Sequence, residues 1–187
     1  MRPALVVCAH GTRDPTGREA VGAVVEAVAA ARPEVSVQAA YVDVHGPAVA
    51  DVVAALPEGE PVAGVVVPLL LSGGYHVHVD IAAAVASRGD VRASPALGPD
   101  ERLVDIVLDR LAGAGALPAS AVVLAAAGSS DPRARADSAR TATRLARRWS
   151  GPVTLAYAAG AAPTVVDAVH AARSSADTVV VASYLLA

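Results

Sequence analysis

The chain alternates short runs of apolar residues with longer alanine-rich segments, and this alternation is typical of a parallel α/β sheet. Within each run, polar and apolar residues do not alternate, as expected for strands that helices cover on both faces. The sequence therefore predicts an α/β fold. The runs that we expect to form strands are 4–9, 35–44, 62–71, 91–95, 121–126, 153–158 and 178–183.

Two of the intervening segments carry apolar residues at helical spacing, so that one side of each predicted helix is apolar. These residues are Val21, Val24, Val25 and Val28 in the first segment, and Val49, Val52, Val53 and Leu56 in the second.

The chain also contains an internal repeat. Shifting residues 40–55 by 116 positions gives seven identities in sixteen positions, and a shift of 117 aligns residues 9–18 with residues 126–135. We therefore predict a tandem pair of parallel-sheet halves, 1–113 and 119–187, separated by the Gly- and Ala-rich stretch 113–119. The repeated residues of the first half are Ala9, Gly11, Asp14, Pro15, Arg18, Ala40, Tyr41, Pro47, Val49, Asp51, Val53 and Ala55.

The second half is expected to be incomplete. Aligning Val65–Val67 with Val179–Val181 places the last residue opposite Gly73, about 40 residues before the first half ends. We interpret this difference as truncation. The alternative is that the last strand stays without its covering helix and needs another chain, which would favour a homodimer.

Composition excludes several classes of protein. All 15 basic residues are arginine and the net charge is −3, which argues against the broad basic surface of a nucleic-acid-binding protein. The single cysteine, Cys8, cannot form an internal disulfide, and the first apolar run is too short for a secretion signal. The longest apolar stretch, 62–71, is far shorter than a membrane span. The sequence predicts a cytoplasmic protein without a membrane or nucleic-acid partner.

Three predicted strands of the first half end in residues that are suited to chemistry. Because ligands of open parallel sheets bind beyond the carboxyl ends of the strands, we expect His10, Asp43 and His76 to share one site. Two imidazoles and a carboxylate suit a divalent metal or proton transfer near neutral pH. In the repeat, His10 aligns with Ala127 and Asp43 with Ala159, so the predicted site lies in the first half only.

Other residues near these strand ends are predicted to contact a substrate. Arg13 lies beside His10, where a guanidinium would pair with a carboxylate of the substrate. The backbone N–H groups of Ser72, Gly73 and Gly74 precede a predicted helix and would bind an anionic group.

For three further residues we favour a structural role over a functional one. His45 and His78 lie two residues beyond Asp43 and His76, and we interpret both as solvated loop or helix-start residues. Cys8 is expected to be a small core residue.

Two motifs resemble those of a known family. Residues 10–15, HGTRDP, are similar to the HGSRDP opening of the class II chelatases, which insert cobalt or iron into sirohydrochlorin. Residues 67–81, VPLLLSGGYHVHVDI, resemble the PLFLxxGxHVxxDI motif of the same family. The resemblance implies a chelatase-like fold over essentially the whole chain and a lyase activity in siroheme or cobalamin biosynthesis.

The resemblance also implies roles for individual residues. His10 and His76 match the two active-site histidines of the family, which bind the incoming Co²⁺ or Fe²⁺ and accept pyrrole N–H protons. Asp43 stands where the family usually has the longer Glu. A sirohydrochlorin-like tetrapyrrole would lie in a cleft between the halves, its carboxylates bound by Arg13 and residues 72–74. The metal is a substrate, and no organic cofactor is implied.

Two other functions stay open at this point. A phosphohistidine-type phosphatase also begins with His-Gly after its first strand, but it carries Arg before the His, where this chain has Ala9. A non-enzymatic carrier of metal or tetrapyrrole would use the same ligands without turnover.

Overall fold

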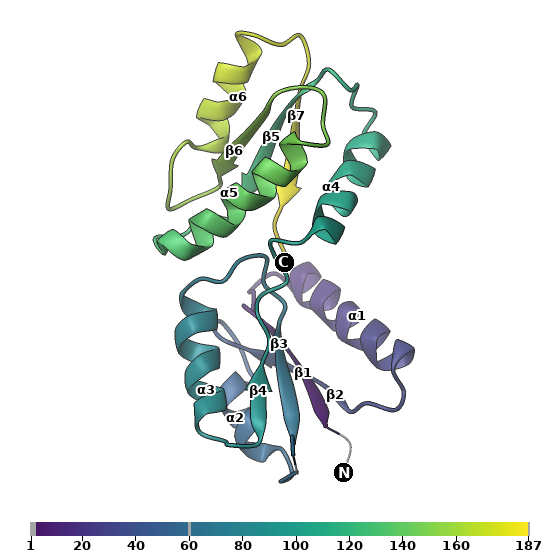
Figure 1. Cartoon of the computed structure of the whole chain (residues 1–187), viewed down its shortest axis with the longest axis vertical. Coiled ribbons are helices and arrows are strands. Elements are labelled where there is room, and N and C mark those ends of the chain that lie inside the picture. The colour runs from purple at the N-terminus through teal and green to yellow at the C-terminus, as the bar shows by residue number, and fades with distance from the viewer. Residues whose placement is uncertain (1–2, 60, 187) are drawn as a thin grey trace. The chain divides into compact units, whose positions relative to one another are not determined.

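The computed structural model describes residues 3–59 and 61–186, and its contacts divide the chain into two compact units. The first unit ends at Leu97 and the second spans Gly98–Leu186 (Figure 1). Every pair of neighbouring strands within the described residues is parallel. The predicted α/β fold with parallel strands is therefore confirmed.

The first unit contains a four-stranded sheet in the order β2-β1-β3-β4. A π-helical turn, η1, continues directly into α3, so the two form one uninterrupted helical segment. The elements in chain order are β1 (Ala4–Ala9), α1 (Pro15–Ala31), β2 (Val37–Tyr41), α2 (Val49–Ala55), β3 (Gly64–Pro68), η1 (His76–Ile81), α3 (Ala82–Ala86) and β4 (Val91–Ala93).

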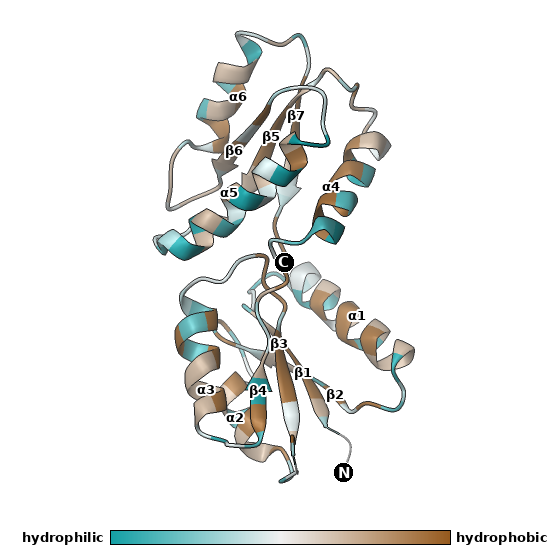
Figure 2. Ribbon diagram, viewed as in Figure 1, coloured by the Kyte–Doolittle hydropathy of each residue, from teal (hydrophilic) through white to brown (hydrophobic). Residues whose placement is uncertain are grey.

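Alternate side chains of β1 face different helices. Val6 and Cys8 belong to one buried cluster with Val53 of α2 and Ile81 of η1. Figure 1 shows α1 on the opposite side of this sheet from α2 and α3. Because both faces are covered, the central strands are mostly apolar, as the predominantly brown colour of β1 and β3 in Figure 2 shows.

The second unit contains a three-stranded sheet in the order β6-β5-β7. Helix α6 packs on all three strands, whereas α4 contacts α5 and β7. All six residues of β5 are buried. The elements are α4 (Glu101–Gly113), β5 (Ala121–Ala126), α5 (Pro132–Ala146), β6 (Val153–Tyr157), α6 (Val165–Arg173) and β7 (Val179–Tyr184).

The two units repeat the same backbone turn after their first strand. In the first unit the Asp43 N–H donates to the His10 carbonyl at 3.0 Å, and in the second the Ala159 N–H donates to the Ala127 carbonyl at 3.1 Å. Gly11 and its repeat partner both have positive φ, 97° and 91°. The sequence alignment of these turns is thereby confirmed.

The alignment of the third strands is wrong by one residue. Val65 pairs with Leu5 of β1, and the residue that pairs with the equivalent Val122 of β5 is Val180 rather than Val179. A run of consecutive valines has no polar residue to mark which side chains face which side, so the sequence does not specify the register there.

Four strands, β2, β3, β4 and β6, are shorter than expected from their apolar runs, and the difference is largest in β2 and β3. β2 ends at Tyr41, whose N–H donates to the Pro47 carbonyl of the returning chain at 2.9 Å. β3 ends at Pro68, which has no N–H with which to continue a ladder.

The compact units divide earlier than the predicted sequence boundary at 113–119. Helix α4 lies in the part of the chain that the sequence assigns to the first half, yet it packs on α5 and β7 of the second unit. The division into halves 1–113 and 119–187 stays a prediction about the repeat.

Over residues 3–59 and 61–186, none of the helices combines the length and the apolar character that crossing a membrane would require.

Arg88, in the turn after α3, pairs with Asp90 in the same turn and links this turn to the end of α2. Arg88 donates to both carboxylate oxygens of Asp90, at 2.7 and 2.9 Å, and to the Leu56 carbonyl at 2.9 Å. Asp90 also accepts from the Gly59 N–H. The Arg88 hydrogen bonds lower the pKa of Asp90 from 3.8 to about 2.

We expect Asp90→Asn to lower the thermal unfolding midpoint at pH 7, because it removes the charge that binds Arg88. The pKa of Asp90 is depressed in the folded chain, so its contribution is fully present above the unfolded value of 3.8 and is lost as pH falls through about 2. The gap between wild type and variant should therefore close between pH 4 and pH 2. Arg88→Ala should abolish the same pH dependence, and a constant gap would contradict this account.

Candidate metal-binding site

Two histidines from distant parts of the first unit lie against each other. The ring centroids of His10 and His76 are 4.7 Å apart, and the ring planes meet at 87°. His10 directly follows β1, and His76 is the first residue of η1. The structure therefore brings together two imidazoles that are 66 residues apart in the sequence.

The fold explains why these rings meet. Side chains two apart along a strand share a face, so His10 continues the face of Cys8 beyond the end of β1. Cys8 belongs to the same buried cluster as Ile81, the last residue of η1. Packing of η1 against this face of β1 thus places His76 beside His10.

Each ring has one nitrogen bound to the protein. His10 Nδ1 lies 3.2 Å from the Gly11 carbonyl, and His76 Nδ1 lies 2.7 Å from an Asp80 carboxylate oxygen. A proton on Nδ1 satisfies both contacts and leaves both Nε2 lone pairs for a metal. Metal-binding histidines in proteins usually have this arrangement, in which the second nitrogen donates to a carboxylate or carbonyl.

Asp43 lies in the loop beside His10, but its carboxylate bonds locally. One oxygen accepts from the Val44 N–H at 2.7 Å. Val44 has φ of 68°, which is unusual for a β-branched residue. Within residues 3–59 and 61–186, no three His, Cys, Asp or Glu side chains are grouped so that they could hold a metal. The chain therefore offers a pair of imidazoles, and the catalytic role of Asp43 stays a prediction.

The predicted substrate-binding residues flank the two histidines along the chain. Arg13 is exposed in the turn between β1 and α1. Ser72, Gly73 and Gly74 are half-buried and lead into η1, where the Gly74 carbonyl accepts the first helical N–H groups. Their contacts with a substrate stay a prediction.

The remaining residues considered in the sequence lie outside this pair. His45 packs its ring on Tyr41, with centroids 4.0 Å apart, and His78 is exposed on η1. Cys8 is fully buried, and burial, together with the charge of Asp80, raises the pKa of its thiol to about 12. A thiol that stays protonated is a poor metal ligand, which agrees with the expected core role.

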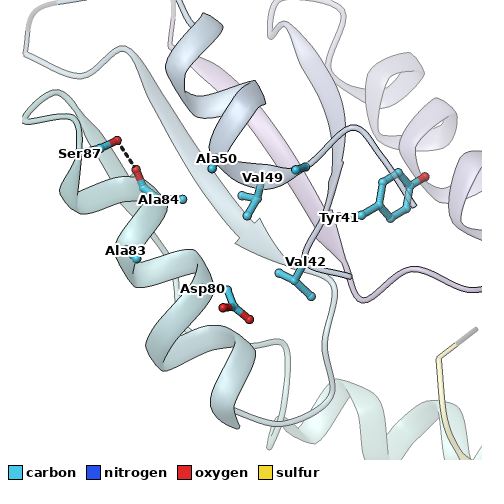
Figure 3. Close-up of a pocket in the computed structure, with 9 residues that line it drawn as sticks. Tyr41, Val42, Val49, Ala50, Asp80, Ala83, Ala84 and Ser87 are labelled. Carbon is cyan, nitrogen blue, oxygen red and sulfur yellow. Dashed lines mark hydrogen bonds between the residues drawn. The ribbon is translucent and has the colours of Figure 1, made fainter. Parts of the chain in front are cut away.

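No role for Asp80 was predicted from the sequence. The signal was present, because Asp80 follows His76 by four residues and such pairs meet on one face of a helix. Asp80 also borders a cavity of about 360 Å³ between β2, α2 and α3. Figure 3 shows its side chain projecting from the helical segment toward Val42.

Comparison with known proteins identifies the family. The family model CbiX matches residues 4–114 and 121–187. The chain belongs to the CbiX family. This confirms the resemblance to the sirohydrochlorin chelatase family that the two sequence motifs indicate. A search of curated protein sequences finds no significant match.

Solved structures show that the fold of this CbiX-family chain is chelatase-like. SirB from Bacillus subtilis with Fe³⁺ is 22% identical with a TM-score of 0.80, and the match covers 100% of this chain and 78% of that one. The sirohydrochlorin chelatase SirB from Bacillus subtilis subspecies spizizenii, in complex with cobalt, is 20% identical with a TM-score of 0.69, covering 98% and 87%. CbiX, described as the terminal enzyme of siroheme biosynthesis in denitrifying bacteria, is 23% identical with a TM-score of 0.67, covering 89% and 73%.

The turn beneath His10 allows a direct test. Gly11 has φ of 97°, and a Cβ there would collide with the Asp43 carbonyl, whereas a Cβ at Gly22 in α1 would meet nothing within 4 Å. We expect Gly11→Ala to lower the free energy of unfolding by about 1–3 kcal/mol. Gly22→Ala should raise it by up to about 1 kcal/mol. Urea unfolding measures both, and equal effects would contradict the described turn.

Proposed function

We propose that this protein inserts a divalent metal, Co²⁺ or Fe²⁺, into a sirohydrochlorin-like tetrapyrrole. The observation that carries the proposal is the contact between His10 and His76, in which both Nε2 atoms are left without a hydrogen bond among the described residues. Family membership supports the same reaction.

A pair of protein ligands suits a metal that must be released. Imidazole nitrogen binds cobalt and iron well, whereas a complete set of protein ligands would hold the ion too firmly. Two ligands leave the other coordination positions to water and then to the pyrrole nitrogens, as in catalytic metal sites that keep positions open. We therefore propose His10 and His76 as the residues that present the metal substrate.

Insertion must also release two protons. The metal replaces two pyrrole N–H protons, so the products are the metallated macrocycle and two protons. A nitrogen that binds the metal cannot accept a proton at the same time. We propose that Asp43, whose exposed carboxylate lies in the loop beside His10, takes part in accepting protons.

The periphery of the macrocycle carries carboxylates that need cationic or N–H partners. The exposed Arg13 supplies a guanidinium three residues after His10, and the backbone of residues 72–74 supplies N–H groups shortly before His76. We propose that these residues bind the substrate carboxylates.

Cobalt and iron are proposed as the metal substrates because structures of relatives contain them. The matched SirB structures contain Fe³⁺ and cobalt, so cobalt and iron are the ions to test first. The histidine pair itself does not discriminate between them, because imidazole suits both.

We expect His10→Ala and His76→Ala each to lower the rate of cobalt insertion into sirohydrochlorin by at least about 100-fold. His10→Ala should not unfold the protein, because the second unit forms the same turn with Ala127. His76→Ala should not unfold it either, because the His76 side chain is partly exposed at the start of η1. Absorbance of the macrocycle measures insertion. His170→Ala, an exposed histidine on α6, is the matched control and should keep full activity.

Full activity in either site variant would contradict the proposal. Many metallated products per protein molecule identify an enzyme, whereas one bound product per molecule would identify a carrier. Hydrolysis of a phosphate ester would instead support a phosphatase.

A second experiment tests substrate binding. We expect Arg13→Ala to raise KM for sirohydrochlorin about tenfold with little change in kcat, because a contact with a peripheral carboxylate stabilises bound substrate and transition state alike. Arg173→Ala, an exposed arginine on α6, is the control. An unchanged KM would remove Arg13 from the proposed site.

A further inference from the structure

Asp80 makes the contact that sets the orientation of the His76 ring. Its carboxylate oxygen lies 2.7 Å from His76 Nδ1, four residues earlier in the same helical segment. We propose that Asp80 is a positioning residue, which keeps the proton of His76 on Nδ1 and turns Nε2 toward His10. The metal-binding role of His76 in this inference rests on the proposed function, whereas the contact between Asp80 and His76 is observed in the structure.

The backbone beneath this contact is firmly held. Ile81, the residue after Asp80, is fully buried in the core cluster, and Ala84 is buried one turn later. The helical segment therefore cannot rotate without removing Ile81 from the core. With the backbone fixed, the hydrogen bond to Asp80 restricts the torsion angles of His76 and thereby the direction of its Nε2 atom.

The Asp80 carboxylate keeps access to water. Its side chain is 34% exposed and borders the cavity that Val42 and Ser87 also line (Figure 3). A hydrated carboxylate remains a strong acceptor because it has not lost its solvation to burial. The fold therefore provides a charged acceptor for His76 with little desolvation.

The two histidines differ in the group that binds the Nδ1 atom of each ring. His10 Nδ1 contacts the backbone carbonyl of Gly11, which no side-chain substitution removes, whereas His76 Nδ1 depends on a side chain. Loss of Asp80 should free the His76 ring to rotate and to carry its proton on Nε2. A protonated Nε2 has no lone pair for a metal.

The test compares Asp80→Ala with Asp80→Asn, using Co²⁺ alone as the probe. We expect Asp80→Ala to weaken Co²⁺ binding about 10- to 100-fold, the usual effect of removing such a partner of a metal-binding histidine. Asp80→Asn should weaken it less, because the amide oxygen still accepts the Nδ1 proton. Glu26→Gln, on the exposed side of α1, removes a carboxylate elsewhere in the same unit and should change nothing.

A spectroscopic readout separates positioning from folding. In ¹⁵N-histidine-labelled protein, with His76→Ala used to assign the signal, His76 should show a protonated Nδ1 in the wild type and in Asp80→Asn. In Asp80→Ala we expect the protonated Nε2 form to appear, with the thermal midpoint near that of the wild type.

The outcomes distinguish this inference from the proposed function. An unchanged His76 tautomer in Asp80→Ala, or Co²⁺ binding within twofold of the wild type, would overturn the role of Asp80. The tautomer needs neither metal nor tetrapyrrole. Failure of the wild type to insert metal, with the tautomer shifted in Asp80→Ala, would therefore count against the proposed function and support the role of Asp80.

Discussion

The turn after β1 is the constraint on which the candidate site depends. Gly11 adopts a positive φ because the Asp43 carbonyl occupies the space that a Cβ would need, and the Asp43 N–H donates to the His10 carbonyl. These contacts hold the ends of β1 and β2 together. They also hold the His10 backbone at the carboxyl edge of the sheet, where the ring can meet a group from another strand end.

The second unit shows that this turn is a scaffold feature. Gly128 repeats the positive φ and the close approach to a carbonyl, here that of Ala159, although no histidine or carboxylate is present at the equivalent positions. The backbone geometry is therefore independent of the chemistry that it carries in the first unit. The alanines of the second unit indicate that His10 and Asp43 are not required for the turn itself.

The contact between His76 and Asp80 adds a property that the scaffold does not supply. A ring at the start of a helical segment can adopt several rotamers, and the carboxylate four residues later favours those that keep its contact with His76 Nδ1. The π-helical form of η1, which begins at His76, is a conformation that often occurs at functional sites. The site thus combines a rigid strand end with a ring that its own helix orients.

Local sequence patterns were enough to predict the parallel α/β fold, the repeat of the first strand and turn, and the places of His10 directly after the first strand and of His76 in the segment that follows the third strand. These follow from local patterns, namely apolar runs, helical spacing and glycine at a tight turn. The register of β7, the packing of α4 on the second unit and the contact between the His10 and His76 rings depended on the folded chain. Uniform valine runs do not specify register, and the partner of a helix or of a distant ring depends on which surfaces the folded chain brings together.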